Sequence, residues 1–191
     1  MSVAMIEEKN TLNTDRPNPI EGTRLRLRPV DLKDANYIYS LRTDPRYNRY
    51  LSPVSGTVDN QRHWIEQYFE RERGGTEYYF VIERKDNNTP CGVVRIYDIR
   101  DSQFTWGSWI LDENKPVKAA LESALLVYDF GFQHLKKEKA VFDVRLDNEK
   151  VISFHAGFGA IETRRDDINA YFVLSKEMFQ NTREKFARIV R

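Results

Sequence analysis

The residues from Trp109 to Leu126, WILDENKPVKAALESALL, read as a strand that turns into an amphipathic helix. A helix start can bind an anion, because its first backbone N–H groups have no partner within the helix. Loops that hold phosphate in this way are usually rich in glycine. This one has none, but it carries Lys115, Pro116 and Lys118. The stretch is therefore either a phosphate site or only a turn.

Cysteine and histidine side chains offer little further chemistry. The chain has a single cysteine, Cys91, so no disulfide can form within it and a reducing compartment is expected. His63, His134 and His155 lie far apart in sequence and have no cysteine partners. This spacing predicts no metal site. Because no base stands near Cys91 in the sequence, we expect a structural role for it.

Composition narrows the class of protein. A chain of 191 residues suits one domain with a real hydrophobic core. Its 30 basic and 29 acidic residues leave no strong field, which argues against nucleic acid as the main partner. The sequence contains no apolar run long enough to span a bilayer and no apolar signal region at its start. These features predict a cytoplasmic protein that does not bind a membrane.

The elements that must position the 109–126 stretch follow from its periodicity and its turn residues. Residues 1–20 are expected to be a poorly ordered lead-in, and residues 21–191 a single domain. Alternating apolar residues and short links predict mainly antiparallel strands, with a parallel crossover through the central helix. The expected strands are 23–30, 77–84, 91–99, 104–111, 139–146, 160–167 and 170–176, and the expected helices are 32–44, 57–75, 116–135, 147–159 and 177–191.

This order of elements resembles the GCN5-related N-acetyltransferase (GNAT) family, in particular the branch that acetylates protein N-termini and small amines. Three stretches carry the resemblance, which covers roughly residues 22–176. They are TRLRLRPVDLKDANYIYSLRTDP, FTWGSWILDENKPVKAALESALLVYDFGF and VFDVRLDNEKVISFHAGFGA. The resemblance implies an α/β (α+β) fold with a mixed, mostly antiparallel central sheet, a splayed parallel pair of strands and flanking helices.

The resemblance also implies acetyl-CoA as co-substrate, with no metal. The pantetheine arm would pair with the backbone at the splayed end of strand 104–111, as an added strand does. The pyrophosphate would lie over residues 113–119, held by N–H groups and the helix dipole. The implied cofactor-binding residues are Trp109, Ile110, Leu111, Lys115, Val117, Lys118, Ala119 and Asn148.

The phosphate loop departs from the family pattern, which places Gln or Arg first and then two spaced glycines. Here the same positions fall within ENKPVKAA. Glycine permits a left-handed conformation or close approach of the backbone to phosphate. Two interpretations stay open. Either the loop presents its N–H groups after Pro116, with charge from Lys115 or Lys118, or it is a plain helix start and the cofactor site is lost.

The family usually has a tyrosine as general acid seven residues after the helix-opening asparagine, and here that position is His155. An imidazole near its ordinary pKa of about 6.5 could protonate the leaving thiolate. It could also only orient the thiol, or be a hydrogen-bonded core histidine. Of the candidate bases near the central strands, Glu77, Asp98 and Asp101 are each more typical of turns or surface. An acceptor amine of low pKa would need no general base.

The acceptor is expected between the first two helices and the strands beside the splay. Aromatic residues and arginine in 46–53 and 104–109 suit a sugar ring or nucleobase, or simple packing. Gly107 suggests a bulge or a close approach of the backbone to a ligand. We predict direct attack of a primary amine on acetyl-CoA in a ternary complex. The amine would belong to a small molecule, such as an amino sugar carried on a nucleotide, or to a protein N-terminus. The alternatives are a non-catalytic module that senses acyl-CoA or binds a partner, and transfer of a larger acyl group. A homodimer also stays open.

Overall fold

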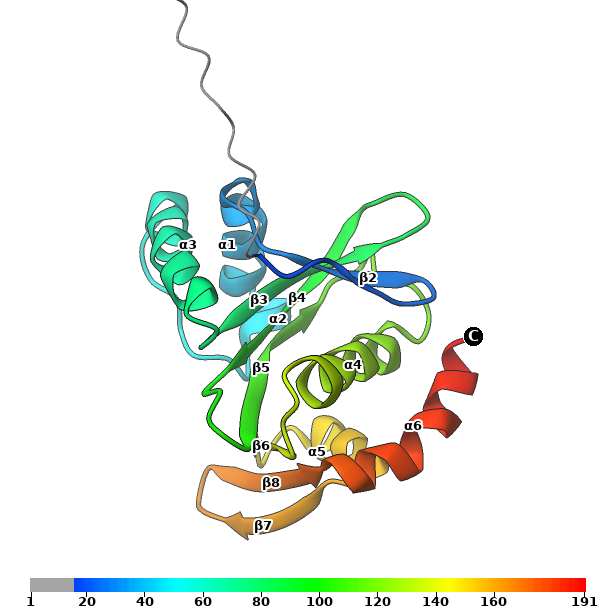
Figure 1. Ribbon diagram of the computed structural model, residues 1–191. Coiled ribbons are helices and arrows are strands. Elements are labelled where there is room, and N and C mark those ends of the chain that lie inside the picture. Colours follow the sequence, from blue (N-terminus) through cyan, green and yellow to red (C-terminus); the bar gives the residue numbers. More distant parts are fainter. Residues whose placement is uncertain (1–15) are drawn as a thin grey trace, which may run out of the picture.

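The computed structural model describes residues 16–191, which build one eight-stranded sheet with helices on both faces (Figure 1). The strand order across it is β1-β2-β3-β4-β5-β6-β8-β7. The strands are β1 (Ile20–Glu21), β2 (Leu25–Pro29), β3 (Tyr78–Arg84), β4 (Pro90–Tyr97), β5 (Gln103–Leu111), β6 (Lys139–Arg145), β7 (Ile161–Arg165) and β8 (Asn169–Ser175). The helices are the 3-10 turn η1 (Leu32–Asp34), α1 (Ala35–Thr43), α2 (Pro45–Asn48), α3 (Val58–Arg73), α4 (Ala119–Asp129), the π-helical turn η2 (Phe130–His134), α5 (Glu149–Gly157) and α6 (Lys176–Val190).

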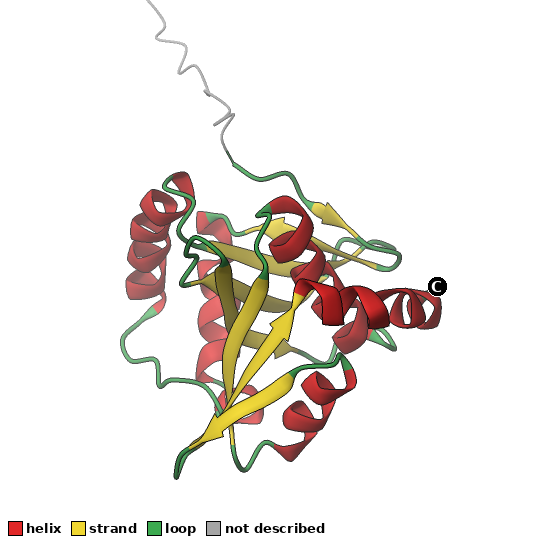
Figure 2. Cartoon of the chain, turned by 60° about the horizontal axis from the view of Figure 1, so that its bottom comes forward, coloured by secondary structure: helices red, strands yellow, loops and turns green. Residues whose placement is uncertain are grey.

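The sheet is antiparallel except between β5 and β6, which run parallel. These two strands pair only through Gln103 with Lys139 and Phe104 with Ala140, and then diverge. Figure 2 shows the twisted sheet and the helices on either side of it. The predicted α+β fold, with a mostly antiparallel sheet and one splayed parallel pair, is confirmed.

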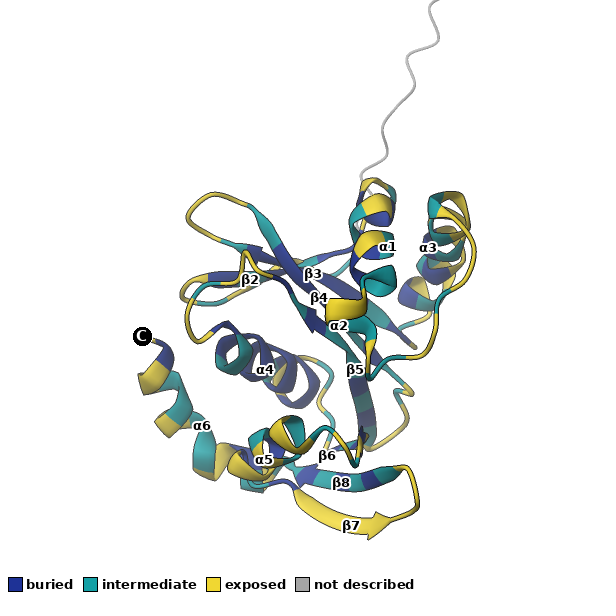
Figure 3. Ribbon diagram, turned by 180° about the vertical axis from the view of Figure 1, so that it is seen from behind, coloured by how far each residue is buried: buried dark blue, intermediate teal, exposed yellow. Residues whose placement is uncertain are grey.

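Two apolar cores lie on the two faces of the sheet, because successive side chains of a strand point to opposite faces. On one face, α1 and α3 cover residues that include Tyr79, Val81 and Ile110. On the other face, α4 packs against the sheet and against α6. Figure 3 shows α4 almost wholly buried. None of the helices in residues 16–191 is long and apolar enough to cross a membrane.

Several helix ends differ from the sequence-based expectation. The expected helix over 32–44 begins with η1, where Asp31 caps as predicted, and Pro45 starts the new helix α2. Proline is well suited to a first helical position, because its missing N–H is not needed there. The expected helix over 116–135 begins only at Ala119 and is π-helical from Phe130. Asn148, not Asp147, is the residue before α5.

The start of the described chain is attached to α3. Arg16 donates from Nε to Oε1 of the buried Glu72 at 2.5 Å, and from its second guanidinium nitrogen to the carbonyl of Val30 at 2.6 Å. The rest of the predicted lead-in, residues 1–15, lies outside the described residues.

Candidate functional site

The splay leaves the end of β5 open on the side of β6. Ile110 turns its carbonyl oxygen toward β4, where it would lie 2.2 Å from a Cβ placed on Gly92. Backbone groups alternate sides along a strand, so the N–H and C=O of Trp109 and Leu111 point toward β6. Because β6 has diverged at that level, these groups can pair with an extended ligand. Trp109, Ile110 and Leu111 are the three residues predicted to bind the cofactor here. The backbone groups of Ile110 pair with β4, so only those of Trp109 and Leu111 lie on the open side.

A bulge precedes this open end. The pairing of β5 with β4 shifts register between Val93, which lies opposite Ile110, and Arg95, which lies opposite Gly107. Ser108 has a φ of 48°, in the left-handed region. A Cβ on Gly107 would lie 3.0 Å from the hydroxyl of Tyr97. The bulge suggested by Gly107 is present, and the close approach of a ligand stays a prediction. A bulge bends its strand and redirects the residues that follow.

The buried Asp112 organises the loop between β5 and α4. Its Oδ1 accepts the N–H of Asn114 at 2.7 Å, and its Oδ2 accepts the hydroxyl of Tyr37 at 2.7 Å. Burial, with the bond to Asp112, raises the pKa of Tyr37, so its phenol stays a donor. The ammonium of Lys115 donates to the carbonyl of Asp112 at 3.1 Å. Through these contacts α1 and the loop hold each other in place.

Lys118 ends the loop in a left-handed conformation, with φ 67° and ψ 11°, directly before α4. Glycine is the residue that favours this conformation. The ammonium of Lys118 donates to the carbonyl of Ile189 in α6. Ala119 donates its N–H to Pro116 at 3.2 Å. Four other backbone N–H groups at this helix start donate no hydrogen bond within the described chain. They belong to Val117, Lys118, Ala120 and Leu121.

His155, the predicted catalytic residue, is buried on α5 with only 4% of its surface exposed. Its Nδ1 lies 3.0 Å from the hydroxyl of Tyr128. Three other aromatic rings surround it, those of Trp106, Phe142 and Phe154. Burial lowers the pKa of His155 to about 3. The imidazole is therefore neutral at pH 7, and the premise of an ordinary pKa near 6.5 is wrong.

Asn148 stands where β6 leads into α5, across the splay from β5. Its backbone carbonyl accepts the N–H groups of Val151 and Ile152, at 3.0 and 3.1 Å. Its side chain does not cap the helix. An amide that the helix does not use stays free for a ligand at this point.

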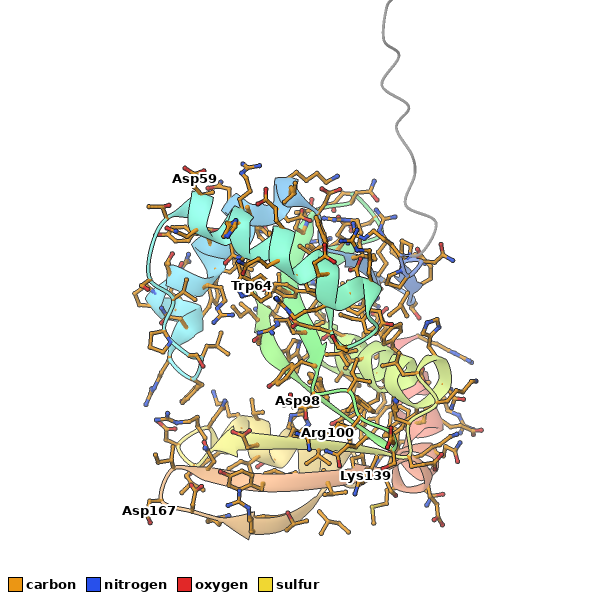
Figure 4. All side chains as sticks on the ribbon, turned by 60° about the vertical axis from the view of Figure 1, so that its left-hand side comes forward. Asp59, Trp64, Asp98, Arg100, Lys139 and Asp167 are labelled. Carbon is orange, nitrogen blue, oxygen red and sulfur yellow. The ribbon has the colours of Figure 1, made fainter. Side chains whose placement is uncertain are left out.

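The three candidate bases differ in burial. Glu77 is buried and bonded to two arginines, accepting from Arg71 Nε at 2.7 Å and from Arg95 Nε at 2.8 Å. The expectation of a turn or surface residue is thus wrong for Glu77. Asp98 and Asp101 are exposed, as expected, and Figure 4 shows Asp98 near Arg100 at the end of β4. Glu77 holds arginine side chains, and this use of both its oxygens disfavours a role as base.

A cavity of about 350 Å³ lies on the α1 and α3 face of the sheet. Trp64 of α3, labelled in Figure 4, packs edge-on against Tyr79 of β3, with ring centroids 5.7 Å apart. The first two predicted helices do line this cavity, but the stretch 104–109 does not. Trp106 of that stretch packs in the other core, as the packing interpretation predicted. The lining residues are Arg42, Pro53, Val54, Ser55, Thr57, Asn60, Gln61, Trp64, Tyr79 and Arg95.

The structure shows no reactive metal or thiol centre in its described part. Across residues 16–191, no three His, Cys, Asp or Glu side chains are grouped to hold a metal ion. Cys91 is buried in the core, and burial raises the pKa of its thiol to about 12. It is therefore a protonated core side chain and not a nucleophile.

Comparison with known proteins gives a consistent result. The family model described as "Acetyltransferase (GNAT) domain" matches residues 24–161. A curated relative, "Probable N-acetyltransferase YjcK" from Bacillus subtilis (strain 168), is 27% identical over 150 residues, which cover 73% of this chain and 82% of the relative.

Solved structures share the fold. The structure titled "Apo FdhC- a nucleotide-linked sugar GNAT" superposes with a TM-score of 0.83 and 41% identity, over 90% of this chain and 97% of the other. A spermidine N-acetyltransferase SpeG chimera from Vibrio cholerae and hSSAT superposes with a TM-score of 0.71 and 18% identity, over 83% and 99% of the two chains. At that identity the second likeness supports the fold alone.

Proposed function

The chain belongs to the GNAT acetyltransferase family, and we propose that it transfers an acetyl group from acetyl-CoA to the amino group of a nucleotide-linked sugar. That it is an acetyl-transfer enzyme follows from the family. The use of acetyl-CoA is supported by one observation, the splayed end of β5 beside a helix start with unused N–H groups. The acceptor class is supported by the 41% identity to a nucleotide-linked sugar GNAT over nearly both whole chains.

The cofactor would bind through backbone groups. The amides of the pantetheine arm would pair with Trp109 and Leu111, and the side chain of Asn148 would reach the arm from the other strand. The pyrophosphate would take the free N–H groups at the start of α4, where the helix dipole favours an anion. The left-handed Lys118 supports this assignment, because it gives a lysine the backbone form that a glycine would favour.

The reaction needs alignment more than covalent help. The neutral amine attacks the thioester carbonyl carbon, the C–S bond breaks, and the acetyl group stays on nitrogen. The amine loses a proton to water and the CoA thiolate takes one from solvent. His155, being neutral, does not supply that proton as an imidazolium. If the hydroxyl of Tyr128 donates to Nδ1, then Nε2 carries the hydrogen and can donate to the sulfur as charge develops on it.

An amine panel tests the proposal. The protein is incubated with acetyl-CoA and either a nucleotide-linked amino sugar, spermidine or a peptide with an N-terminal alanine, and free CoA is followed with a thiol reagent. We expect the nucleotide sugar to give the highest kcat/KM, by at least about tenfold. A preference for spermidine or peptide would overturn the acceptor class.

A second measurement separates catalysis from binding. Tight binding of CoA with no thiol release from any amine would favour the acyl-CoA sensing module over the enzyme. Replacing acetyl-CoA by longer acyl-CoA thioesters in the same assay identifies the acyl group. Failure of CoA to bind would refute the site at the start of α4.

A further inference from the structure

Two residues that line the cavity between α1, α3 and the sheet each carry a polar atom that is covered by neighbouring protein atoms and has no hydrogen-bond partner. These atoms are Nε of Arg42 and the hydroxyl of Tyr79. Only two further such atoms occur in the described part of the chain, on Trp106 and Asn169. A buried donor without a partner destabilises a folded protein, so such atoms are rare and call for an explanation. Two such residues line one cavity, and the Arg42 guanidinium lies close enough to Tyr79 to lower the pKa of its phenol against the effect of burial. Their unmet hydrogen bonds point to a ligand that binds between them.

The cavity is rich in donors and positively charged. Arg42 and Arg95 line it, and Arg71 lies behind it against the ring of Trp64. The one carboxylate bonded to this group is Glu77, which holds both Arg71 and Arg95. Three arginines against one carboxylate leave an excess of positive charge. Arginine is the side chain best suited to phosphate, because its guanidinium forms paired hydrogen bonds.

Tyr79 contributes a donor, not an anion. Its side chain is 1% exposed, and burial raises the pKa of the phenol to about 12, against the opposing charges of Arg42 and Arg95. A protonated phenol beside two guanidinium groups presents hydrogens to any group placed between them. The complementary ligand is an anion with several acceptor oxygens, such as a phosphate ester.

Strand pairing relates the position of the cavity to the open end of β5. Tyr79 of β3 lies opposite Arg95 of β4, and Arg95 lies opposite Gly107 at the bulge. Two steps between neighbouring strands amount to about 10 Å. This span is comparable to a hexose with one phosphate attached. A ligand with its phosphate in the cavity would have to extend this far, past the Tyr97 side chain that lies against Gly107, to bring its sugar to the bulge before Trp109.

We propose that this cavity binds the diphosphate of the nucleotide-linked acceptor, with Arg42 and Tyr79 as the residues that determine specificity for it. The proposal rests on the proposed function and adds to it the place and chemistry of the nucleotide handle. The polar residues at the rim, Ser55, Thr57, Asn60 and Gln61, are donors and acceptors for the nucleoside. In Arg42 only Nε lacks a partner, because its second guanidinium nitrogen donates to the carbonyl of Ser52 at 3.1 Å. Acceptors without a phosphate would leave this Nε and the hydroxyl of Tyr79 unpaired and be used poorly.

Replacing Tyr79 by phenylalanine gives the sharpest test. The change removes only a hydroxyl that has no partner in the structure, so Y79F should keep or slightly raise Tm. Isothermal titration of UDP, dTDP and GDP into the full-length protein without CoA should show the affinity of the best nucleotide falling about tenfold in Y79F. Inorganic pyrophosphate serves as the probe of the phosphate contacts alone.

Two controls separate the role of the cavity from general stability. In Tyr68→Phe the lost hydroxyl bonds the buried Glu72 and the N–H of Tyr79, so Tm should fall while nucleotide affinity stays within about twofold. Arg42→Gln should raise the KM for the nucleotide sugar about tenfold or more, while Arg62→Gln, on the exposed side of α3, should leave it unchanged.

The outcomes distinguish the two proposals. Efficient acetylation of the nucleotide sugar with unchanged affinity and KM in Y79F and R42Q would overturn the assignment of the cavity and leave the function intact. Acetylation of other amines only, with no nucleotide binding, would overturn both. Nucleotide binding that Y79F weakens, with the amine panel negative, would support the cavity and overturn the acceptor.

Discussion

The protein should lose stability on mild acidification, and His155 should be the cause. Burial lowers the pKa of this residue from 6.5 to about 3, so between these values the unfolded chain binds a proton that the folded chain does not. Wherever the unfolded state binds more protons, stability decreases as the pH is lowered. The loss therefore begins near pH 6.5, grows as the pH falls, and levels off near pH 3.

The size of the effect follows from the two pKa values. At pH 5 the unfolded histidine lies about 1.5 pH units below its pKa, which corresponds to about 2 kcal/mol of lost stability. For a chain of this length, 1 kcal/mol shifts Tm by about 2–4 °C, so the shift between pH 7 and pH 5 should be about 4–8 °C. Most carboxylates stay ionised in that range, which isolates the histidine contribution.

The assay is thermal unfolding at half-unit steps from pH 7.5 to 4.5, for the wild type and for His155→Gln. The glutamine can still bond the hydroxyl of Tyr128 but cannot titrate, so its Tm should be nearly flat over this range. Proton NMR of the three histidines should show His155 untitrated at pH 5. Equal Tm slopes in both proteins, or a His155 pKa above 6, would refute the desolvation argument.

Three further predictions concern the loop, the core and the arm site. Lys118→Gly removes the strain of a non-glycine residue at φ 67° and should raise stability by about 1 kcal/mol in urea unfolding, while CoA affinity stays within a few-fold. Lys118→Glu should weaken CoA binding several-fold, and an unchanged Kd would exclude a role for the charge of the side chain. Gly131→Ala places a Cβ within 2.1 Å of the buried Phe104 ring and should lower stability by about 3 kcal/mol or more; a loss below about 1 would mean that the ring moves freely. Asn148→Ala should leave Tm within about 1 °C, because the side chain caps nothing, and weaken CoA several-fold by titration; a large drop in Tm would show a structural role instead.

Local patterns in the sequence were enough for most of the fold. The alternation in β2, the cap at Asp31 and the turn before α4 depend on residues a few positions apart, and each was predicted. Gly107 marked the bulge correctly for the same reason, because a bulge depends on local backbone freedom. The end of the first helix before Pro45 was predicted, but the new helix α2 that begins at Pro45 was missed, because proline both stops and starts helices. The late start of α4 at Ala119 was also missed, because the loop after Asp112 is shaped by a hydrogen bond from Tyr37.

The sequence by itself determined the order of the main elements and the parallel crossover, and its resemblance to a known family added the splay and the helix start that faces it. Only the tertiary structure decided the charge state of His155, because desolvation comes from aromatic rings on four different elements. It also decided that Arg42 and Tyr79 meet in one cavity and that Glu77 is buried between arginines. Protonation and unmet hydrogen bonds depend on which groups surround an atom, and residues far apart in the chain supply those surroundings.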